Sequence, residues 1–373
     1  MQWYQAAIVF CVAFGVTYCT VPFASWIARR IGAIDLPSSR RVNYDPVPRC
    51  GGIALYLGLV AACFAIFVGV RFFGWGLDDL YVLRGVNYYV LFLGVTAMFA
   101  VGLVDDITQL MPKVKFAGQV LAACIVVASG VGIGAVRALG IDYVTLGWLD
   151  YPITVAYLVI FVNITNLIDG LDGLASGMVA IAAASLMYLV FQRGGFTIAL
   201  GCLAIVAVCL AFLRYNFFPA STFMGDSGSH LLGLVVGIVA VSGVVRTQGF
   251  IIMLAPLVIA GVPVIDTISA IVRRLREHEH VGQADLGHIH HRLMRAGLSQ
   301  KRSVALLWTC AAVLAAAGCL LSSYSGVVQL VVLVVLAVAV FFVIWHFGLF
   351  KPVLRHHYDN KGKRGPRVLG RKG

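Results

Sequence analysis

The chain has 373 residues, of which 61% are hydrophobic and only 12% are charged, and its mean hydropathy is +0.94. This composition excludes a soluble globular protein, in which about a quarter of the residues are charged. The nine cysteines lack CxxC spacing, and all but Cys50 fall in apolar runs, so they predict neither disulfides nor a metal site. The formal charge of +12 indicates basic loops beside membrane segments, and we expect no nucleic-acid partner.

Apolar segments of roughly 17 to 25 residues, the length that crosses a bilayer, recur along the whole chain. They predict an all-α polytopic membrane protein. About eleven transmembrane helices would form a single membrane domain over residues 1–350. The first segment lacks a basic start and a cleavage site, which favours a retained helix over a signal peptide. The predicted helices are 3–27, 52–73, 87–104, 115–136, 152–168, 171–191, 196–214, 229–247, 250–272, 304–323 and 326–350.

The basic residues predict the orientation of these helices. If the loop after the first helix is cytoplasmic, alternate loops collect 23 of the 28 Lys and Arg residues on that side. The N-terminus is then outside and the C-terminus cytoplasmic. The basic tail 351–373 is predicted to be a disordered segment that binds anionic lipids. The predicted cytoplasmic loops are 28–51, 105–115, 215–228 and 273–303.

Adjacent acids end the third predicted helix. Asp105 and Asp106 oppose the dipole at a helix C-terminus, which a divalent cation or phosphate chemistry would explain, although a solvated helix end remains an alternative. Lys113 and Lys115 follow in the same loop. They would balance the acids, either as surface charges or as ligands of phosphate oxygens.

Four amide and carboxylate side chains recur every three residues at a later membrane boundary, where such groups are costly. A regular helix would point the first and last in opposite directions, but glycines at 170 and 173 can break it and let the set converge on one pocket. A simple turn between two helices is the alternative. The four residues are Asn163, Asn166, Asp169 and Asp172.

Two further polar motifs lie in cytoplasmic loops. Asp226 precedes a predicted helix, where it could be an N-cap or a carboxylate that meets Mg²⁺ and phosphate. His288, His290 and His291 lie beside Arg292 without any nearby cysteine, so pyrophosphate oxygens suit them better than zinc. A surface histidine cluster is the alternative reading.

Taken together, five motifs follow the order found in the polyprenyl-phosphate N-acetylhexosamine-1-phosphate transferases of glycosyltransferase family 4. That family includes the bacterial GlcNAc-1-phosphate transferases and the muramoyl-pentapeptide phosphotransferase, and the chain resembles it over most of the membrane region. The motifs are RRVNYDPVPRCGG (40–52), VDD with KVKFAGQ (104–119), NITNLIDGLDGLASG (163–177), FMGDSGS (223–229) and GHIHHRL (287–293).

The resemblance implies a role for each matching position. It implies that Asp226 and Asn166 hold Mg²⁺, for which Mn²⁺ could substitute, and that Asp105, Asp106 and Asp226 are catalytic. An acceptor loop would contain Arg49, Gly51 and Gly52. Nucleotide and phosphate groups would be bound by Lys115, Lys113, Asn163, Asp169, Asp172, His288, His290, His291 and Arg292.

The implied reaction transfers an N-acetylhexosamine-1-phosphate, in the first instance GlcNAc-1-phosphate, from a UDP-sugar to undecaprenyl or decaprenyl phosphate and releases UMP. It would take place on the cytoplasmic face of the inner (plasma) membrane, as the first membrane step toward a cell-envelope polymer such as cell wall, teichoic acid or O-antigen lipopolysaccharide. Asp105 would orient or deprotonate the acceptor, with a covalent aspartyl-phosphate as a less favoured variant.

Three motif positions and one alternative class of protein affect how far this implied reaction can be specified. Ile289 interrupts the histidines as in the GlcNAc branch, so a muramoyl-pentapeptide donor is the less favoured alternative. Asn43 and Cys50 depart from the usual residues of the first motif, so that loop assigns no particular sugar. The rival from another class is a transporter, in which ionisable groups would cluster at the bilayer midplane. The sequence leaves a homodimer open.

Overall fold

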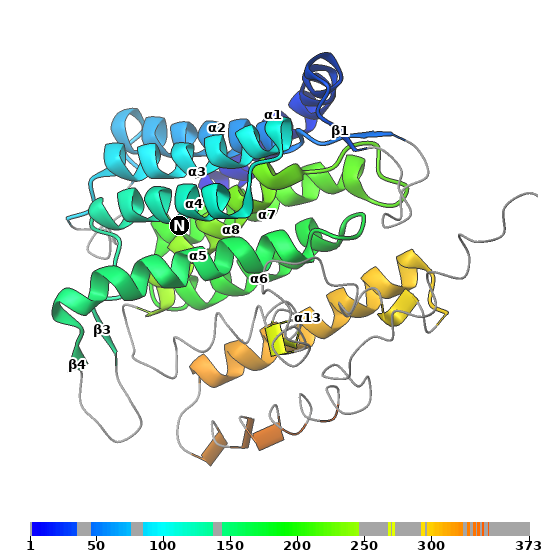
Figure 1. Ribbon diagram of the computed structural model, residues 1–373. Coiled ribbons are helices and arrows are strands. Elements are labelled where there is room, and N and C mark those ends of the chain that lie inside the picture. Colours follow the sequence, from blue (N-terminus) through cyan, green and yellow to red (C-terminus); the bar gives the residue numbers. More distant parts are fainter. Residues whose placement is uncertain are drawn as a thin grey trace, which may run out of the picture.

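The computed structural model describes residues 2–35, 46–75, 85–136, 144–245 and 297–323, with short pieces between 268 and 294 and between 327 and 342. These residues form an all-α bundle (Figure 1). Eight of the described helices are long and apolar enough to cross a membrane. The all-α polytopic membrane architecture predicted from the sequence is thus confirmed.

Nine of the eleven predicted spans coincide with long helices. The predicted spans 250–272 and 326–350 lie largely outside the described residues. The nine helices are α1 (Trp3–Ile31), α2 (Gly52–Phe72), α3 (Tyr88–Thr108), α4 (Pro112–Ala128), α5 (Asp150–Ile168), α6 (Leu174–Phe191), α7 (Phe196–Asn216), α8 (Gly225–Ala240) and α13 (Gln300–Ser323).

Helix α4 ends eight residues before the predicted boundary at 136. The run from 129 to 134 contains three glycines, and Gly130 and Gly134 adopt the positive φ angles of 99° and 75° that end a helix. The chain then forms strand β3 (Ala135–Val136), which pairs with β4 (Val144–Thr145). A 3-10 turn at Gly147–Leu149 leads into α5. Glycine thus shortens a segment that apolar length alone assigned to one helix.

A second small hairpin at the opposite end of the bundle joins two distant loops. Strands β1 (Ile34–Asp35) and β2 (Val47–Pro48) pair antiparallel. The segment from the end of β2 to the start of α2 is hydrogen-bonded to the chain before α8: Phe223 donates to the Pro48 carbonyl at 2.8 Å, and Gly52 donates to the Met224 carbonyl at 2.9 Å. The starts of α2 and α8 are therefore fixed side by side.

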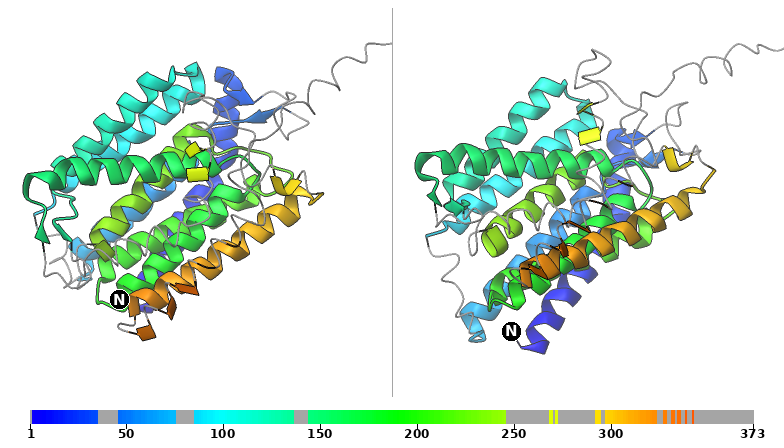
Figure 2. Two further views of the ribbon diagram at one scale, coloured as in Figure 1. Left: turned by 60° about the horizontal axis from the view of Figure 1, so that its bottom comes forward. Right: turned by 90° about the horizontal axis from the view of Figure 1, so that it is seen from below.

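Burial distinguishes the outer helices from the central one. Helix α1 buries a single stripe at intervals of three or four residues, from Gln5 to Ala28, and leaves its other face for lipid. Helix α8 is buried on almost all sides and packs against α2, α3, α5, α6 and α7. Both views in Figure 2 place the yellow-green α8 inside the bundle and the orange α13 on its outer side, where α13 contacts α6.

Glycine at Gly102 permits the closest approach between α3 and α8. A Cβ there would lie 2.5 Å from the Asp226 carbonyl oxygen and 2.6 Å from Cα of Ser227, and neither backbone atom can move away alone. In contrast, a Cβ at Gly15 of α1 would meet nothing within 4 Å. Alanine substitutions at Gly102 and at Gly15 therefore test a crowded and an uncrowded helical position.

We expect Gly102→Ala to destabilise the protein by about 1–3 kcal/mol, because the added methyl group must push α3 and α8 apart. The measurement is the apparent melting temperature in detergent, which should fall by several degrees. Gly15→Ala is the control and should leave it unchanged or raise it slightly, since alanine is the better helix former. Equal melting temperatures of the two variants would contradict this view of the α3–α8 contact.

Candidate active site

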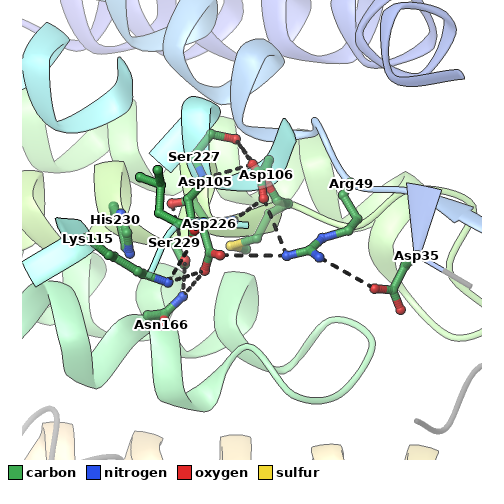
Figure 3. A network of polar contacts seen from close by, with 12 residues as sticks. Asp35, Arg49, Asp105, Asp106, Lys115, Asn166, Asp226, Ser227, Ser229 and His230 are labelled. Atoms are coloured by element: carbon green, nitrogen blue, oxygen red, sulfur yellow. Dashed lines mark hydrogen bonds and ion pairs between the residues drawn. The ribbon is translucent and has the colours of Figure 1, made fainter. Parts of the chain in front are cut away.

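Charged and amide side chains from five segments meet at one end of the bundle (Figure 3). Helices α3 and α5 end here, whereas α2, α4 and α8 begin here, because successive helices alternate in direction. The gathered residues are Asp35 and Arg49 of the hairpin, Asp105 and Asp106 of α3, Lys115 of α4, Asn166 of α5, and Asp226, Ser227, Ser229 and His230 of α8.

Asp106 holds the first turn of α8. Its carboxylate accepts hydrogen bonds from the backbone N–H of Asp226 at 2.7 Å, the backbone N–H of Ser227 at 3.0 Å and the Ser227 hydroxyl at 2.6 Å. The first N–H groups of a helix lack partners within it, and the helix dipole favours a negative charge there. The side chain of Asp106 has no exposed surface. It therefore fixes the position of Asp226 from a neighbouring helix.

Arg49 connects three of the carboxylates. Its guanidinium lies 3.8 Å from Asp35, 3.6 Å from Asp106 and 3.6 Å from Asp226. The backbone N–H of Arg49 also donates to the Ala33 carbonyl at 3.0 Å, which holds the residue against the hairpin. With its side chain 19% exposed, Arg49 supplies positive charge at the edge of the buried acids.

Asp226 lies at the centre of the site. Lys115 bridges it to Asp105, with Nζ 3.1 Å from Asp226 Oδ1 and 2.9 Å from Asp105 Oδ2. The Asn166 amide donates to the same Asp226 oxygen and, at 3.0 Å, to the Ser229 hydroxyl. The Asp226 side chain keeps 16% of its surface exposed, so it remains accessible to a ligand.

A second polar layer lies one helical turn deeper and was not predicted in full. Asn163 donates to Gln119 Oε1 at 2.8 Å, so Gln119 Nε2 faces His230 Nε2 at 3.2 Å as the donor. His230 and Gln119 are almost completely buried. His230 lies four residues after Asp226, and Gln119 lies four residues after Lys115. This i, i+4 spacing is the signal that could have identified both from the sequence.

Asp169 and Asp172 follow α5 and have different surroundings. Asp172 accepts from the Ala220 N–H at 2.9 Å and so joins its loop to the one before α8. Asp169 is half-buried, and its carboxylate makes no hydrogen bond or ion pair with another described residue. Burial raises the pKa of Asp169 to about 8, with the negative charges of Asp226 and Asp106 as further causes. A bound cation would reverse this shift, because opposite charge favours the carboxylate.

Other residues named from the sequence lie elsewhere or serve in packing. Lys113 is exposed and makes no ion pair with a described residue. A Cβ at Gly51 would lie 2.6 Å from the Phe212 ring, and one at Gly52 would overlap the first turn of α8, so both glycines permit close packing. Arg292 is half-buried. The three motif histidines, His288, His290 and His291, lie outside the described residues.

The oxygen-rich donor set fits Mg²⁺ better than a transition metal. Within the described part of the chain, no group of three His, Cys, Asp or Glu side chains is arranged to hold a metal ion. Mg²⁺ does not require one, because it is commonly held by one or two carboxylates together with substrate phosphates and water. Asp226 and the Asn166 amide, which can rotate to offer its oxygen, supply such a partial set.

The fold and the site together define a membrane-embedded phosphotransferase. Residues 88–244 match the family model described as glycosyl transferase family 4. A protein of Bacillus subtilis named "Probable undecaprenyl-phosphate N-acetylglucosaminyl 1-phosphate transferase" is 36% identical over 80% of this chain and 80% of its own length. The chain belongs to glycosyl transferase family 4.

Two further relatives extend the comparison. The "Decaprenyl-phosphate N-acetylglucosaminephosphotransferase" of Mycolicibacterium smegmatis is 33% identical over 82% of this chain and 79% of that protein. The "Undecaprenyl-phosphate alpha-N-acetylglucosaminyl 1-phosphate transferase" of Escherichia coli is 29% identical over 86% of this chain and 84% of that protein. The family suggested by the sequence motifs is thus confirmed.

Proposed function

We propose that this protein transfers GlcNAc-1-phosphate from UDP-GlcNAc to a polyprenyl phosphate, with release of UMP. The observation that carries the proposal is the position of Asp226 between Lys115, Arg49 and Asn166, at the end of the bundle where five chain segments meet. The names of the relatives, all of which specify N-acetylglucosamine and a polyprenyl phosphate, supply the substrates.

Asp226 and Asn166 would hold Mg²⁺, which when bound neutralises diphosphate charge and the charge that develops on the leaving group. Lys115 and Arg49 would bind donor phosphate oxygens through their charged donors. Asp169, at the start of the α5–α6 loop, is close enough for the charges of Asp226 and Asp106 to raise its pKa, and it would bind the donor. Asp172 and Asn163 would shape that pocket from behind, since both are hydrogen-bonded to protein groups.

The chemical step is attack by an acceptor phosphate oxygen on the β-phosphorus of the donor. A new P–O bond forms there, the bond to the bridging oxygen breaks, and UMP leaves with that oxygen. The acceptor is already mostly dianionic at neutral pH, because the second pKa of a phosphate monoester is about 6. Little proton removal is therefore needed.

Asp105 would orient the acceptor rather than form a covalent intermediate. One of its carboxylate oxygens accepts from the Leu110 N–H at 2.7 Å and the other pairs with Lys115. The bond from Leu110 keeps the carboxylate in place, which supports an orienting role. The Asp106 side chain is fully buried and hydrogen-bonded to α8. This supports a role in positioning Asp226, without direct contact with substrate.

The site would face the cytoplasm, with eleven spans, an outside N-terminus and a cytoplasmic C-terminal tail that binds anionic lipid. The asymmetry of basic residues supports this orientation. A transporter is less well supported, because the acidic and basic side chains gathered in the described part of the chain lie at helix ends and not at mid-helix, where alternating-access sites form. A muramoyl-pentapeptide donor is less well supported because the named relatives use N-acetylglucosamine.

The direct test supplies radiolabelled UDP-GlcNAc, undecaprenyl phosphate and Mg²⁺ to the detergent-solubilised protein. We expect UMP release and a labelled lipid product, each dependent on both lipid and metal. UDP-N-acetylmuramoyl-pentapeptide as the donor should give little product. Labelled lipid that forms from the pentapeptide donor alone would replace the proposal with the muramoyl alternative.

A further inference from the structure

Lys115 occupies the position beside Asp226 where a cation would bind. Its ammonium group lies 3.1 Å from Asp226 Oδ1 and 2.9 Å from Asp105 Oδ2. The same Asp226 oxygen accepts from the Asn166 amide, which in this arrangement presents its NH₂ group and not its oxygen. Both residues proposed as metal ligands are therefore turned toward partners within the protein.

A metal ion can reach Asp226 only if this arrangement changes. A dication within a few ångströms of an ammonium group is repelled strongly in a partly buried site. Arg49 adds a second positive charge 3.6 Å from Asp226, but it is anchored by Asp35 and Asp106 as well. Lys115 is the more easily displaced of the two, since its flexible side chain pairs with two carboxylates whereas Arg49 pairs with three.

A nucleotide diphosphate supplies what the displacement requires. Its oxygens offer Lys115 a new anionic partner, and its negative charge offsets the dication that replaces the ammonium group at Asp226. Metal and diphosphate should then each strengthen the binding of the other, as thermodynamic linkage demands.

We propose that Lys115 makes metal binding at Asp226 depend on the nucleotide diphosphate. Without nucleotide, Lys115 competes with the metal for Asp226. With nucleotide bound, Lys115 moves to the phosphates and the competition ends. This inference rests on the proposed function, and it adds that Lys115 determines when the metal binds as well as holding the donor.

The test measures Mn²⁺ binding to the detergent-solubilised protein by electron paramagnetic resonance, with and without UDP. In the absence of UDP we expect Lys115→Met to bind Mn²⁺ roughly ten- to a hundredfold more tightly than the unmodified protein, because one nearby positive charge has been removed. UDP should strengthen Mn²⁺ binding strongly in the unmodified protein and much less in the variant. A titration of UDP alone corrects for Mn²⁺ bound in solution.

Two variants serve as controls. Arg71→Met removes one positive charge from the exposed last turn of α2, at the end of that helix away from the site, and it should bind Mn²⁺ as the unmodified protein does. Lys115→Arg retains the charge and should keep nucleotide-free Mn²⁺ binding weak. Melting temperatures establish that each variant is folded.

The outcomes separate the inference from the proposed function. If Mn²⁺ binds with UDP but Lys115→Met binds it no more tightly than the unmodified protein without UDP, the inference is wrong and the proposed function stands. If Mn²⁺ binding persists unchanged in Asp226→Asn, with and without UDP, the metal assignment to Asp226 is wrong and the inference fails with it.

Discussion

Asp226→Asn should reduce sugar-phosphate transfer by about a thousandfold or more, because the carboxylate at the centre of the site is lost while its shape is kept. Asparagine cannot supply the negative charge that would hold a cation at this position. The measurement is UMP release at saturating Mg²⁺ and both substrates. Raising Mg²⁺ further should not restore the rate, since the charge itself is missing.

The stability of Asp226→Asn should stay close to that of the unmodified protein. The substitution leaves the charges of Asp105 and Asp106 balanced by Lys115 and Arg49, and the Asp226 backbone N–H still donates to Asp106. An active site commonly gains or keeps stability when a functional charge is removed. A large drop in the melting temperature would contradict the assignment of Asp226 to function.

The matched control is Asp150→Asn at the opposite end of α5. Asp150 Oδ1 accepts from the Gly134 N–H at 2.9 Å and the Thr154 hydroxyl at 3.0 Å, and an asparagine oxygen can accept both. We expect full transfer activity in this control. Asp226→Asn that transfers at a rate within tenfold of the control would remove Asp226 from the catalytic centre.

Asp106→Ala should lose both activity and stability, unlike Asp226→Asn. Alanine leaves the N–H groups of Asp226 and Ser227 and the Ser227 hydroxyl without their buried acceptor, and it removes one partner of Arg49. The loss of a buried, hydrogen-bonded carboxylate costs about 3–5 kcal/mol. Transfer should fall about a hundredfold or more, because Asp226 is no longer held in place.

Asp106→Asn tests the same role more gently. The amide keeps one acceptor oxygen, so its melting temperature and activity should fall between those of Asp106→Ala and the unmodified protein. Apparent melting temperatures in detergent and the UMP-release assay provide the two measurements. An Asp106→Ala protein that melts at the unmodified temperature would show that Asp106 does not hold α8.

The membrane helices were predictable because lipid imposes a simple requirement. Every backbone polar group must be bonded within its own helix there, so apolar length identifies a span. The error at α4 had a local cause, since positive φ angles at Gly130 and Gly134 end the helix where apolar length continued it. The β1–β2 hairpin was not predicted, because strands of two residues give no periodic signal.

The sequence by itself also determined that the acids share one end of the protein. Each span crosses the membrane once, so an even number of spans between two motifs places both motifs on the same side. Only the tertiary structure decided which partner each of these charged side chains contacts. Lys113 and Lys115 are equally basic, but two residues turn a helix by about 200°, so only one of them can face Asp226. Asp105 and Asp106 diverge in the same way, one toward Lys115 and the other beneath α8. Those directions depend on how neighbouring helices are rotated about their axes and on how closely glycines let them pack. Neither the rotation nor the distance between helices can be read from the spacing of residues along the chain.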